Sequence, residues 1–260
     1  NVSIDHLVHS YVRGNFRNLS PIILAKSCHD LDILCWLIGK RCKKVSSFGH
    51  LDFFTKEHAP EGSAYRCLDC SVESTCPFSA VKRYLGPDTG WPTCMISVDT
   101  SLEARKRALR ETRYGVCAFH SDNTVANHQV VNLEYEDRIT VSFVLSGFNT
   151  VETREIRLMG TKGDIFANME ENYIRVRTFG SKEDRVIRPT IYGGSHSGGD
   201  VLLMQDVVTR LQNNDMHQAR TQASLSLESH LIAFAAEHAR ASDTVVQLED
   251  FTRNISNQRG

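Results

Sequence analysis

Hydrophobic and polar residues alternate at the start of the chain and then change to a helical spacing. The stretch NVSIDHLVHSYV, residues 1–12, alternates from its second position and predicts a strand that is buried on one face. Apolar residues recur every three to four positions over 21–38, which predicts a helix. Ser20 suits the N-cap of this helix, Pro21 its first position and Gly39 its end.

The later part of the chain predicts a hairpin, several more strands and three more helices. Residues 100–112 predict an amphipathic helix capped by Thr100 or Ser101. Residues 128–147 predict a hairpin that turns at Glu136–Arg138. The other predicted strands cover 43–54, 154–160, 161–169, 173–180 and 183–190, and the other helices cover 198–213 and 219–242.

This order of elements predicts an α+β fold, namely an open, largely antiparallel β-sheet with helices on one face. We expect a single domain over 1–260, with a Cys-containing excursion from the main fold at about 55–98. Several strands carry large residues on both faces. We therefore expect a second subunit to cover the open sheet face, in a homodimer or homotetramer.

Composition narrows the choice of partners. The chain has 260 residues and a formal net charge of −1, which gives no electrostatic reason to expect nucleic acid or a membrane surface as partner. No apolar run approaches the roughly 20 residues that a membrane span needs, and no signal peptide opens the chain. The eight cysteines are irregularly spaced, which is typical of reduced thiols in a cytoplasmic protein.

The first candidate site is a pair of polar residues on the helix predicted over 21–38. Lys26 and His29 stand on the face that also presents Ile22, Ile33 and Trp36. An ammonium and an imidazole are costly to bury among apolar residues, so the pair is expected to border a cavity. A neutral His29 there could accept a proton from a hydroxyl. The alternative is a solvated helix turn in which Lys26 pairs with Asp30.

Three polar stretches offer further candidates for ligand binding. Guanidinium, amide and imidazole groups suit hydroxyls, carboxylates or phosphates. Ordinary surface turns have the same composition, and the glycine-rich turn at 193–200 is either an anion-binding loop or a plain connection. The candidate residues in the three stretches are Arg13, Asn15, Arg17, His120, Asn123 and His196.

A group of cysteines offers a candidate metal site. Cys67, Cys70 and Cys76 form a C-x-x-C pair with a third thiol six residues later, a spacing that suits zinc. A structural site needs a fourth ligand, for which the candidates are Cys94, His58 and Cys28. Reduced, partly buried cysteines that only pack the excursion are the alternative.

Three motifs together resemble a known family. The segments SPIILAKSCHDLDILCWLIG, GTKGDIF and GGSHSGGDVLLMQDVV resemble the C-terminal domain of the glucose–fructose oxidoreductase/inositol dehydrogenase (Gfo/Idh/MocA) family, a dihydrodipicolinate-reductase-like domain. The resemblance covers nearly the whole chain. It implies that a Rossmann domain, absent from this sequence, precedes the chain and holds NAD or NADP. This chain would then be the substrate-binding and oligomerisation domain.

The resemblance also implies an activity. Such enzymes exchange a hydride between nicotinamide and a sugar or cyclitol hydroxyl carbon, and His29 matches the family histidine. Lys26 would polarise a hydroxyl or bind a phosphate. The family aspartate is replaced by Ala25. The proton relay, or even the reaction, is therefore free to differ from that of the family. The alternatives are a glycosidase-like enzyme that oxidises its sugar transiently and a non-catalytic ligand-binding or assembly module. The chain alone is expected to be inactive.

Overall fold

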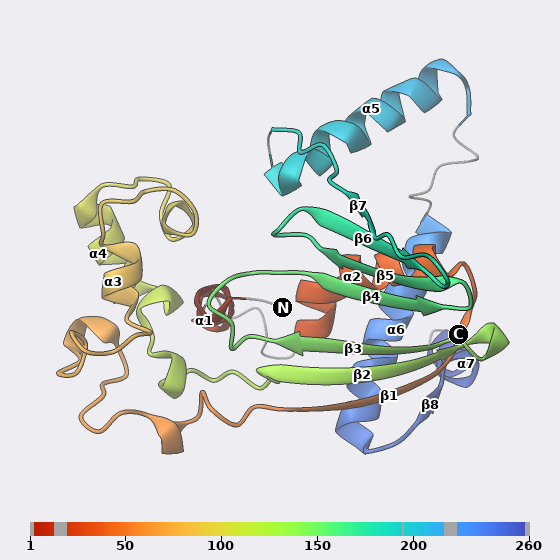
Figure 1. Ribbon diagram of the computed structural model, residues 1–260. Helices are drawn as coiled ribbons and strands as arrows, with labels where there is room; N and C mark the ends of the chain where they lie inside the picture. Colours follow the sequence, from red (N-terminus) through yellow and green to blue (C-terminus); the bar gives the residue numbers. More distant parts are fainter. Residues whose placement is uncertain (1–2, 13–19, 194, 216–222, 258–260) are drawn as a thin grey trace. The chain divides into compact units, whose positions relative to one another are not determined.

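The computed structural model describes residues 3–12, 20–193, 195–215 and 223–257 (Figure 1). The chain divides into two compact units, 1–151 together with 228–260, and 152–227. The prediction of a single functional domain over 1–260 stays a prediction.

The first unit is a four-stranded sheet with helices and a long excursion. The excursion predicted at about 55–98 belongs to a longer connection, residues 51–127, to which the name refers from here on. It contains 3₁₀ helices at Lys56–His58, Cys67–Asp69, Thr93–Met95, Arg113–Gly115 and Ala118–His120. The helices and strands of this unit are α1 (Ile4–Val12), α2 (Ile22–Ile38), β1 (Cys42–His50), α3 (Ala80–Tyr84), α4 (Leu102–Glu111), β2 (His128–Tyr135), β3 (Thr140–Ser146), most of α6 (Ala223–Ser242), β8 (Val246–Gln247) and α7 (Leu248–Asn257). A further 3₁₀ turn at Glu136–Arg138 joins β2 to β3, so the predicted hairpin is confirmed.

The strands of this sheet run in the order β3-β2-β1-β8, and every pair is antiparallel. Val45 on β1 pairs with Leu133 on one side and Val246 on the other. One face of the sheet packs on α2 and α6 in a single apolar core. Its buried members include Ile23 and Leu31 of α2, Ile232, Ala235 and Ala236 of α6, and Val45, Val131, Leu133, Tyr135 and Leu145 of the sheet.

The opposite face of this sheet carries an exposed apolar row. Phe48 pairs with Val130, and Val130 pairs with Val144, so the three side chains lie side by side across three strands. Phe48 is 60% exposed and Val144 54% exposed. Helices therefore cover one face of the sheet, as predicted.

Helix α2 ends where its sequence predicts and begins one residue later than predicted. Pro21 is its N-cap residue, and Gly39 ends it in the left-handed conformation at φ 62°, where its N–H bonds to the Cys35 carbonyl at 2.9 Å. Glycine adopts this conformation at no steric cost. Ser20 does not cap the helix, because its hydroxyl contacts the Pro21 carbonyl instead.

The prediction of a strand at residues 1–12 is wrong, because residues 4–12 form helix α1. Ile4, Leu7 and Val8 follow a helical spacing, and Leu7 is fully buried. Ser3 caps the helix by accepting the His6 N–H at 3.3 Å. The alternation that indicated a strand covers fewer residues than the helical pattern. Burial of Leu7 and Val8 in the main core favours the helix over the strand.

The excursion has a small core of its own around Tyr84 and Leu109. The predicted helix at 100–112 is confirmed as α4, with the Ser101 hydroxyl accepting the Ala104 N–H at 3.3 Å. Arg105 is 6% exposed and donates to the carbonyls of Tyr84 and Gly86 at 2.7 and 2.8 Å. This guanidinium therefore ties α4 to the end of α3.

The second unit is another antiparallel sheet, followed by helix α5 (Gly199–Gln212), with a short 3₁₀ turn at Ser195–Gly198 between them. Its strands run in the order β4 (Glu155–Gly160), β5 (Gly163–Asn168), β6 (Tyr173–Thr178) and β7 (Arg185–Ile187). The four strands predicted here are confirmed, but they form a separate sheet. At Gly163 a Cβ atom would lie 1.9 Å from the Arg177 carbonyl oxygen, so the turn requires glycine.

The fold is α+β with antiparallel sheets, as predicted. The short strand β8 and the helix α7 are additions, since the sequence pattern predicted no element after residue 242. Among the described residues, no helix has both the length and the apolar character that crossing a bilayer requires.

Candidate functional site

His29 lies on the exposed side of α2. Its Nδ1 atom is 3.6 Å from the Cys28 sulfur. Ile33 and Trp36, one and two turns further along, are 45% and 61% exposed, so they form an apolar strip beside the imidazole. Ile22 was predicted on this face, but it is 1% exposed and belongs to the core.

Lys26 is half-buried, and its ammonium bonds to the Nε2 atom of His6 on α1. The ring of His6 in turn meets Trp91 of the excursion edge to face, with ring centroids 4.8 Å apart. An ammonium can only donate, so the Nε2 atom of His6 accepts this bond. Three distant segments thus meet at Lys26.

A second histidine of α1 extends this cluster inward. His9 is 3% exposed, and its Nδ1 atom lies 2.5 Å from the Tyr84 hydroxyl. Burial raises the pKa of Tyr84, so its hydroxyl stays protonated in this hydrogen bond with His9. The His9 ring stacks on Tyr114 at 5.6 Å and meets Trp91 at 5.8 Å.

His6, His9 and Trp91 were not predicted from the sequence as part of this site. The signal for the two histidines was their spacing of three residues, which places both on one side of a helix. The prediction of a strand hid it, since a strand would have put them on opposite faces. Trp91 lies far away in sequence and carries no local signal.

The other predicted binding residues lie in different surroundings. The Nε2 atom of His120 bonds to the Ser63 hydroxyl at 2.9 Å. The Asn123 amide accepts the Val125 N–H and donates to the Val125 carbonyl, both at 3.3 Å, so it closes its own turn. A substrate-binding role for His120 and Asn123 stays a prediction.

His196 belongs to the second unit. Its side chain is 82% exposed and its Nδ1 atom lies 2.9 Å from an Asp200 carboxylate oxygen, one turn further along at the start of α5. Its role also stays a prediction. Arg13, Asn15 and Arg17 lie outside the described residues.

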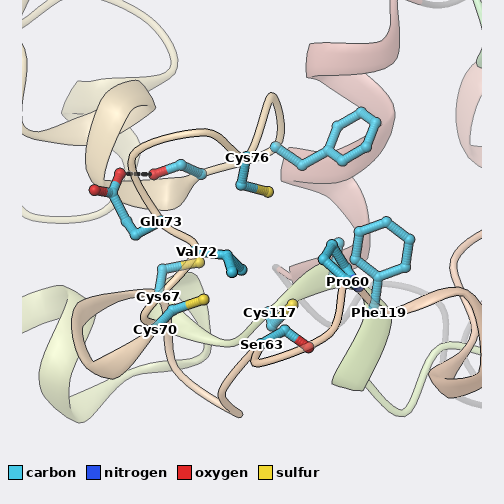
Figure 2. Close-up of a pocket in the computed structure, with 12 residues that line it drawn as sticks. Pro60, Ser63, Cys67, Cys70, Val72, Glu73, Cys76, Cys117 and Phe119 are labelled. Carbon is cyan, nitrogen blue, oxygen red and sulfur yellow. Dashed lines mark hydrogen bonds between the residues drawn. The ribbon is translucent and has the colours of Figure 1, made fainter.

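The predicted cysteine group surrounds one small cavity, and a fourth thiol joins it. Cys67, Cys70, Cys76 and Cys117 all line this cavity of about 10 Å³ (Figure 2). Burial raises the pKa of Cys67 to about 11 and also raises the pKa of Cys117. All eight cysteines of the chain are free thiols.

None of the fourth ligands proposed from the sequence lines this cavity. Cys94 is exposed, Cys28 lies on α2, and His58 bonds to Thr55 at 3.1 Å and stacks on Phe53. Within the described ranges, no three His, Cys, Asp or Glu side chains are already set at metal-binding positions. The fourth thiol at this cavity is Cys117, and the four thiols line the cavity without converging on one point.

The chain is similar in sequence to one curated protein and in fold to several solved structures. No protein-family model matches the chain. It is 24% identical over 200 residues to YteT of Bacillus subtilis (strain 168), whose name as an oxidoreductase is itself provisional. The match covers 70% of this chain and 45% of YteT, so the chain spans about half the length of this relative.

Three solved structures have the same fold at low sequence identity. An oxidoreductase domain protein from Kribbella flavida is 15% identical with a TM-score of 0.54, over 88% of this chain and 51% of that one. An oxidoreductase from Agrobacterium radiobacter, in complex with NAD⁺, L-tartaric acid and magnesium, is 12% identical with a TM-score of 0.52, over 88% and 49%. UDP-N-acetylglucosamine 3-dehydrogenase GnnA from Acidithiobacillus ferrooxidans is 8% identical with a TM-score of 0.50, over 86% and 51%.

These neighbours share the fold of Gfo/Idh/MocA-type oxidoreductases, and the same fold is present here. Each solved structure is about twice as long as the matched region. Fold alone does not establish an activity, which depends on the residues of the site.

Proposed function

We propose that this chain is the substrate-binding and oligomerisation part of a cytoplasmic NAD(P)-dependent oxidoreductase that acts on a sugar or cyclitol hydroxyl. The observation that carries the proposal is His29, exposed on α2 beside Lys26, in a fold shared with an NAD⁺-bound oxidoreductase and a nucleotide-sugar dehydrogenase. The rest of the active site would come from protein outside this chain.

A nicotinamide cofactor would supply the acceptor for the substrate's hydride. The chain contains no G-x-G-x-x-G motif after a strand, so its residues fit beside such a cofactor and do not cradle its phosphates. The exposed side of α2 fits this position, because Ile33 and Trp36 offer an apolar surface next to a polar His29. Flat rings and neighbouring domains both pack on such surfaces.

His29 would accept the proton of the substrate hydroxyl as the hydride leaves the same carbon. No carboxylate stands four residues before it, since that position is Ala25. The proton therefore passes to His29 without an acidic partner at this place on the helix. Lys26, fixed by its bond to His6, would place positive charge near the hydroxyl oxygen and help it to lose its proton.

Oligomerisation would use the open face of the first sheet. The row of Phe48, Val130 and Val144 exposes apolar surface across three strands, and a second copy of the chain would bury it. A homodimer or homotetramer built through this face does not involve the opposite face of the sheet, which packs on α2.

The test uses the protein with its natural upstream residues restored. Nicotinamide absorbance is followed with each cofactor over a panel of sugars, sugar acids and inositols. His29→Ala is expected to lower kcat/KM at least about 100-fold, the usual size of a lost proton-transfer group. His238→Ala is the matched control, since this exposed histidine of α6 contacts Phe251. Full activity in His29→Ala would refute the proposed role.

The missing acidic partner of His29 favours one alternative. A relay without that carboxylate is compatible with an enzyme that oxidises a sugar transiently, allows elimination and reduces it back. Such an enzyme would release sugar from a chromogenic glycoside while its bound cofactor shows no net change. Protein that binds neither cofactor would contradict both enzyme readings and leave a ligand-binding or assembly module.

A further inference from the structure

Four cysteines from two parts of the excursion line one small cavity. Cys67 and Cys70 stand at the two ends of a 3₁₀ turn. Cys76 lies six residues after Cys70, and Cys117 comes about 40 residues later in the chain. The cavity volume of about 10 Å³ is that of a space for a single water-sized sphere. Figure 2 shows the four side chains grouped around Val72.

The backbone brings Cys117 to this group. Arg66 and Val116, the residues just before Cys67 and Cys117, form an antiparallel bridge. The Cys117 N–H also bonds to the Tyr65 carbonyl at 2.9 Å. The fourth thiol is therefore positioned by main-chain pairing and not by a flexible loop.

Short turns hold the other three thiols. The Cys70 N–H bonds to the Cys67 carbonyl at 3.3 Å, and the Cys76 N–H bonds to the Val72 carbonyl at 3.1 Å. A C-x-x-C pair on a tight turn leaves both sulfur atoms on the same side, as chelation requires. Metal binding would require these side chains to rotate, because among the described residues no three of them are already set around one point.

The remaining polar groups of the cavity wall are engaged elsewhere. The Ser79 hydroxyl donates to the Glu73 carboxylate and accepts the Lys82 N–H. The Ser63 hydroxyl bonds to His120. The wall that faces the cavity is otherwise apolar, with Val72, Phe78 and Phe119 among its members. The thiols are thus the main potential metal ligands in this wall. Backbone groups nearby hydrogen-bond to two of them, at Ala80 for Cys67 and at Phe119 and His120 for Cys117.

We propose that Cys67, Cys70, Cys76 and Cys117 bind one structural zinc ion. Four thiols with no oxygen ligand select zinc among the common divalent ions, in a closed tetrahedral site. Binding releases four protons, as one Zn²⁺ and four thiols give one Zn(S-Cys)₄ unit of charge −2. The ion would join the turns at 67–76 to the start of the segment that leads into β2. This inference does not depend on the proposed enzymatic activity.

A crosslink of this kind suits the part of the chain that contains it. The excursion is made mostly of short turns and has only a small core around Tyr84 and Leu109. Segments with so little buried apolar surface are commonly stabilised by metals or disulfides. The free state of all eight cysteines leaves the metal as the available crosslink.

The first experiment is metal analysis of the full chain, purified under reducing conditions. Elemental mass spectrometry is expected to find about one zinc per chain. Cys70→Ser and Cys117→Ser are expected to lower this to below roughly 0.2. Cys94→Ser and Cys28→Ser, which change thiols outside the cavity, keep the metal. Circular dichroism shows whether each variant is folded. The zinc content of the unchanged protein tests the proposal even if a variant fails to fold.

A second measurement reports the ligand set directly. Replacing zinc by Co²⁺ is expected to give the thiolate-to-cobalt charge-transfer and visible bands of a tetrahedral sulfur site. These bands weaken in Cys117→Ser and stay in Cys94→Ser. Less than roughly 0.2 zinc per chain in the unchanged protein after incubation with zinc would overturn the proposal. So would undiminished zinc in a folded Cys117→Ser variant, or disulfides among the four thiols in reduced preparations.

Discussion

The ammonium of Lys26 and the imidazole of His6 are hydrogen-bonded to each other, which joins helix α2 to helix α1. Both side chains are half-buried, so water competes only in part for the bond. A double-mutant cycle of His6→Ala and Lys26→Met is expected to show a coupling free energy of about 1 kcal/mol in urea unfolding. The exposed pair Lys106 and Glu103 is the control and should show coupling close to zero. Additive effects at His6 and Lys26 would contradict the finding.

Arg105 is expected to be a strong determinant of the excursion's stability. Its buried guanidinium bonds to the carbonyls of Tyr84 and Gly86. Arg105→Met leaves both carbonyls without this donor, so the free energy of unfolding should fall by about 3 kcal/mol. Arg107→Met, on the exposed side of the same helix, should change it by less than about 0.5 kcal/mol. Equal effects of the two variants in chemical denaturation would refute this account.

Gly115 is expected to tolerate no side chain. A Cβ atom there would lie 1.7 Å from the carbonyl oxygen of Leu109, which is fixed backbone at the end of α4. Gly115→Ala should therefore lower the free energy of unfolding by about 2–4 kcal/mol, because the backbone must move. At Gly193 nothing lies within 4 Å of the added atom, so Gly193→Ala is the control. Thermal unfolding of the two variants gives the comparison.

The cysteines should differ widely in reactivity. Cys94 is exposed, whereas burial and the nearness of Cys35 raise the pKa of Cys42 to about 12. The thiolate is the reactive form, so Cys42 should be alkylated very slowly at neutral pH. Its rate should rise about tenfold per pH unit as long as the pH stays below that pKa and the protein stays folded. Peptide mapping by mass spectrometry after iodoacetamide treatment follows both residues, and comparable rates at pH 7 would contradict the prediction.

The open sheet face offers a test of oligomerisation. If a second copy covers Phe48, Val130 and Val144, Val144→Glu places a charge in that interface and should yield monomers in light scattering. Val98→Glu is the control, because Val98 is fully exposed within the excursion. An oligomer that persists in a folded Val144→Glu variant would mean that another surface joins the subunits.

Local patterns in the sequence were enough to predict most of the elements. Pro21 and Gly39 bracket α2, and the hairpin of β2 and β3 turns where Glu136–Arg138 interrupts the alternation. Residues 4–12 were predicted wrongly, because a strand and a helix compete there over a short stretch, and β8 and α7 were not predicted. Packing of Leu7 into the core decided for the helix, and no local pattern contains that information.

The candidate site was predictable only where its residues share one helix. Lys26 and His29 stand three residues apart and were found in this way. The contacts from His6 to Lys26 and Trp91, and the arrival of Cys117 beside Cys67, depend on chain segments that meet only after folding. Residue spacing along the sequence does not predict such long-range contacts.

The position of β1 in its sheet has a consequence for the order of folding. β1 is flanked by β2 and β8, and its Val45 pairs with Leu133 and Val246, both far along the chain. Closing such long loops costs conformational entropy before the strand contacts form, so the pairing of β1 is slow. The local hairpin of β2 and β3 should form first and β1 should dock late, after the intervening excursion has been synthesised. Amide protons of β1 are therefore expected to gain protection from exchange after those that pair β2 with β3.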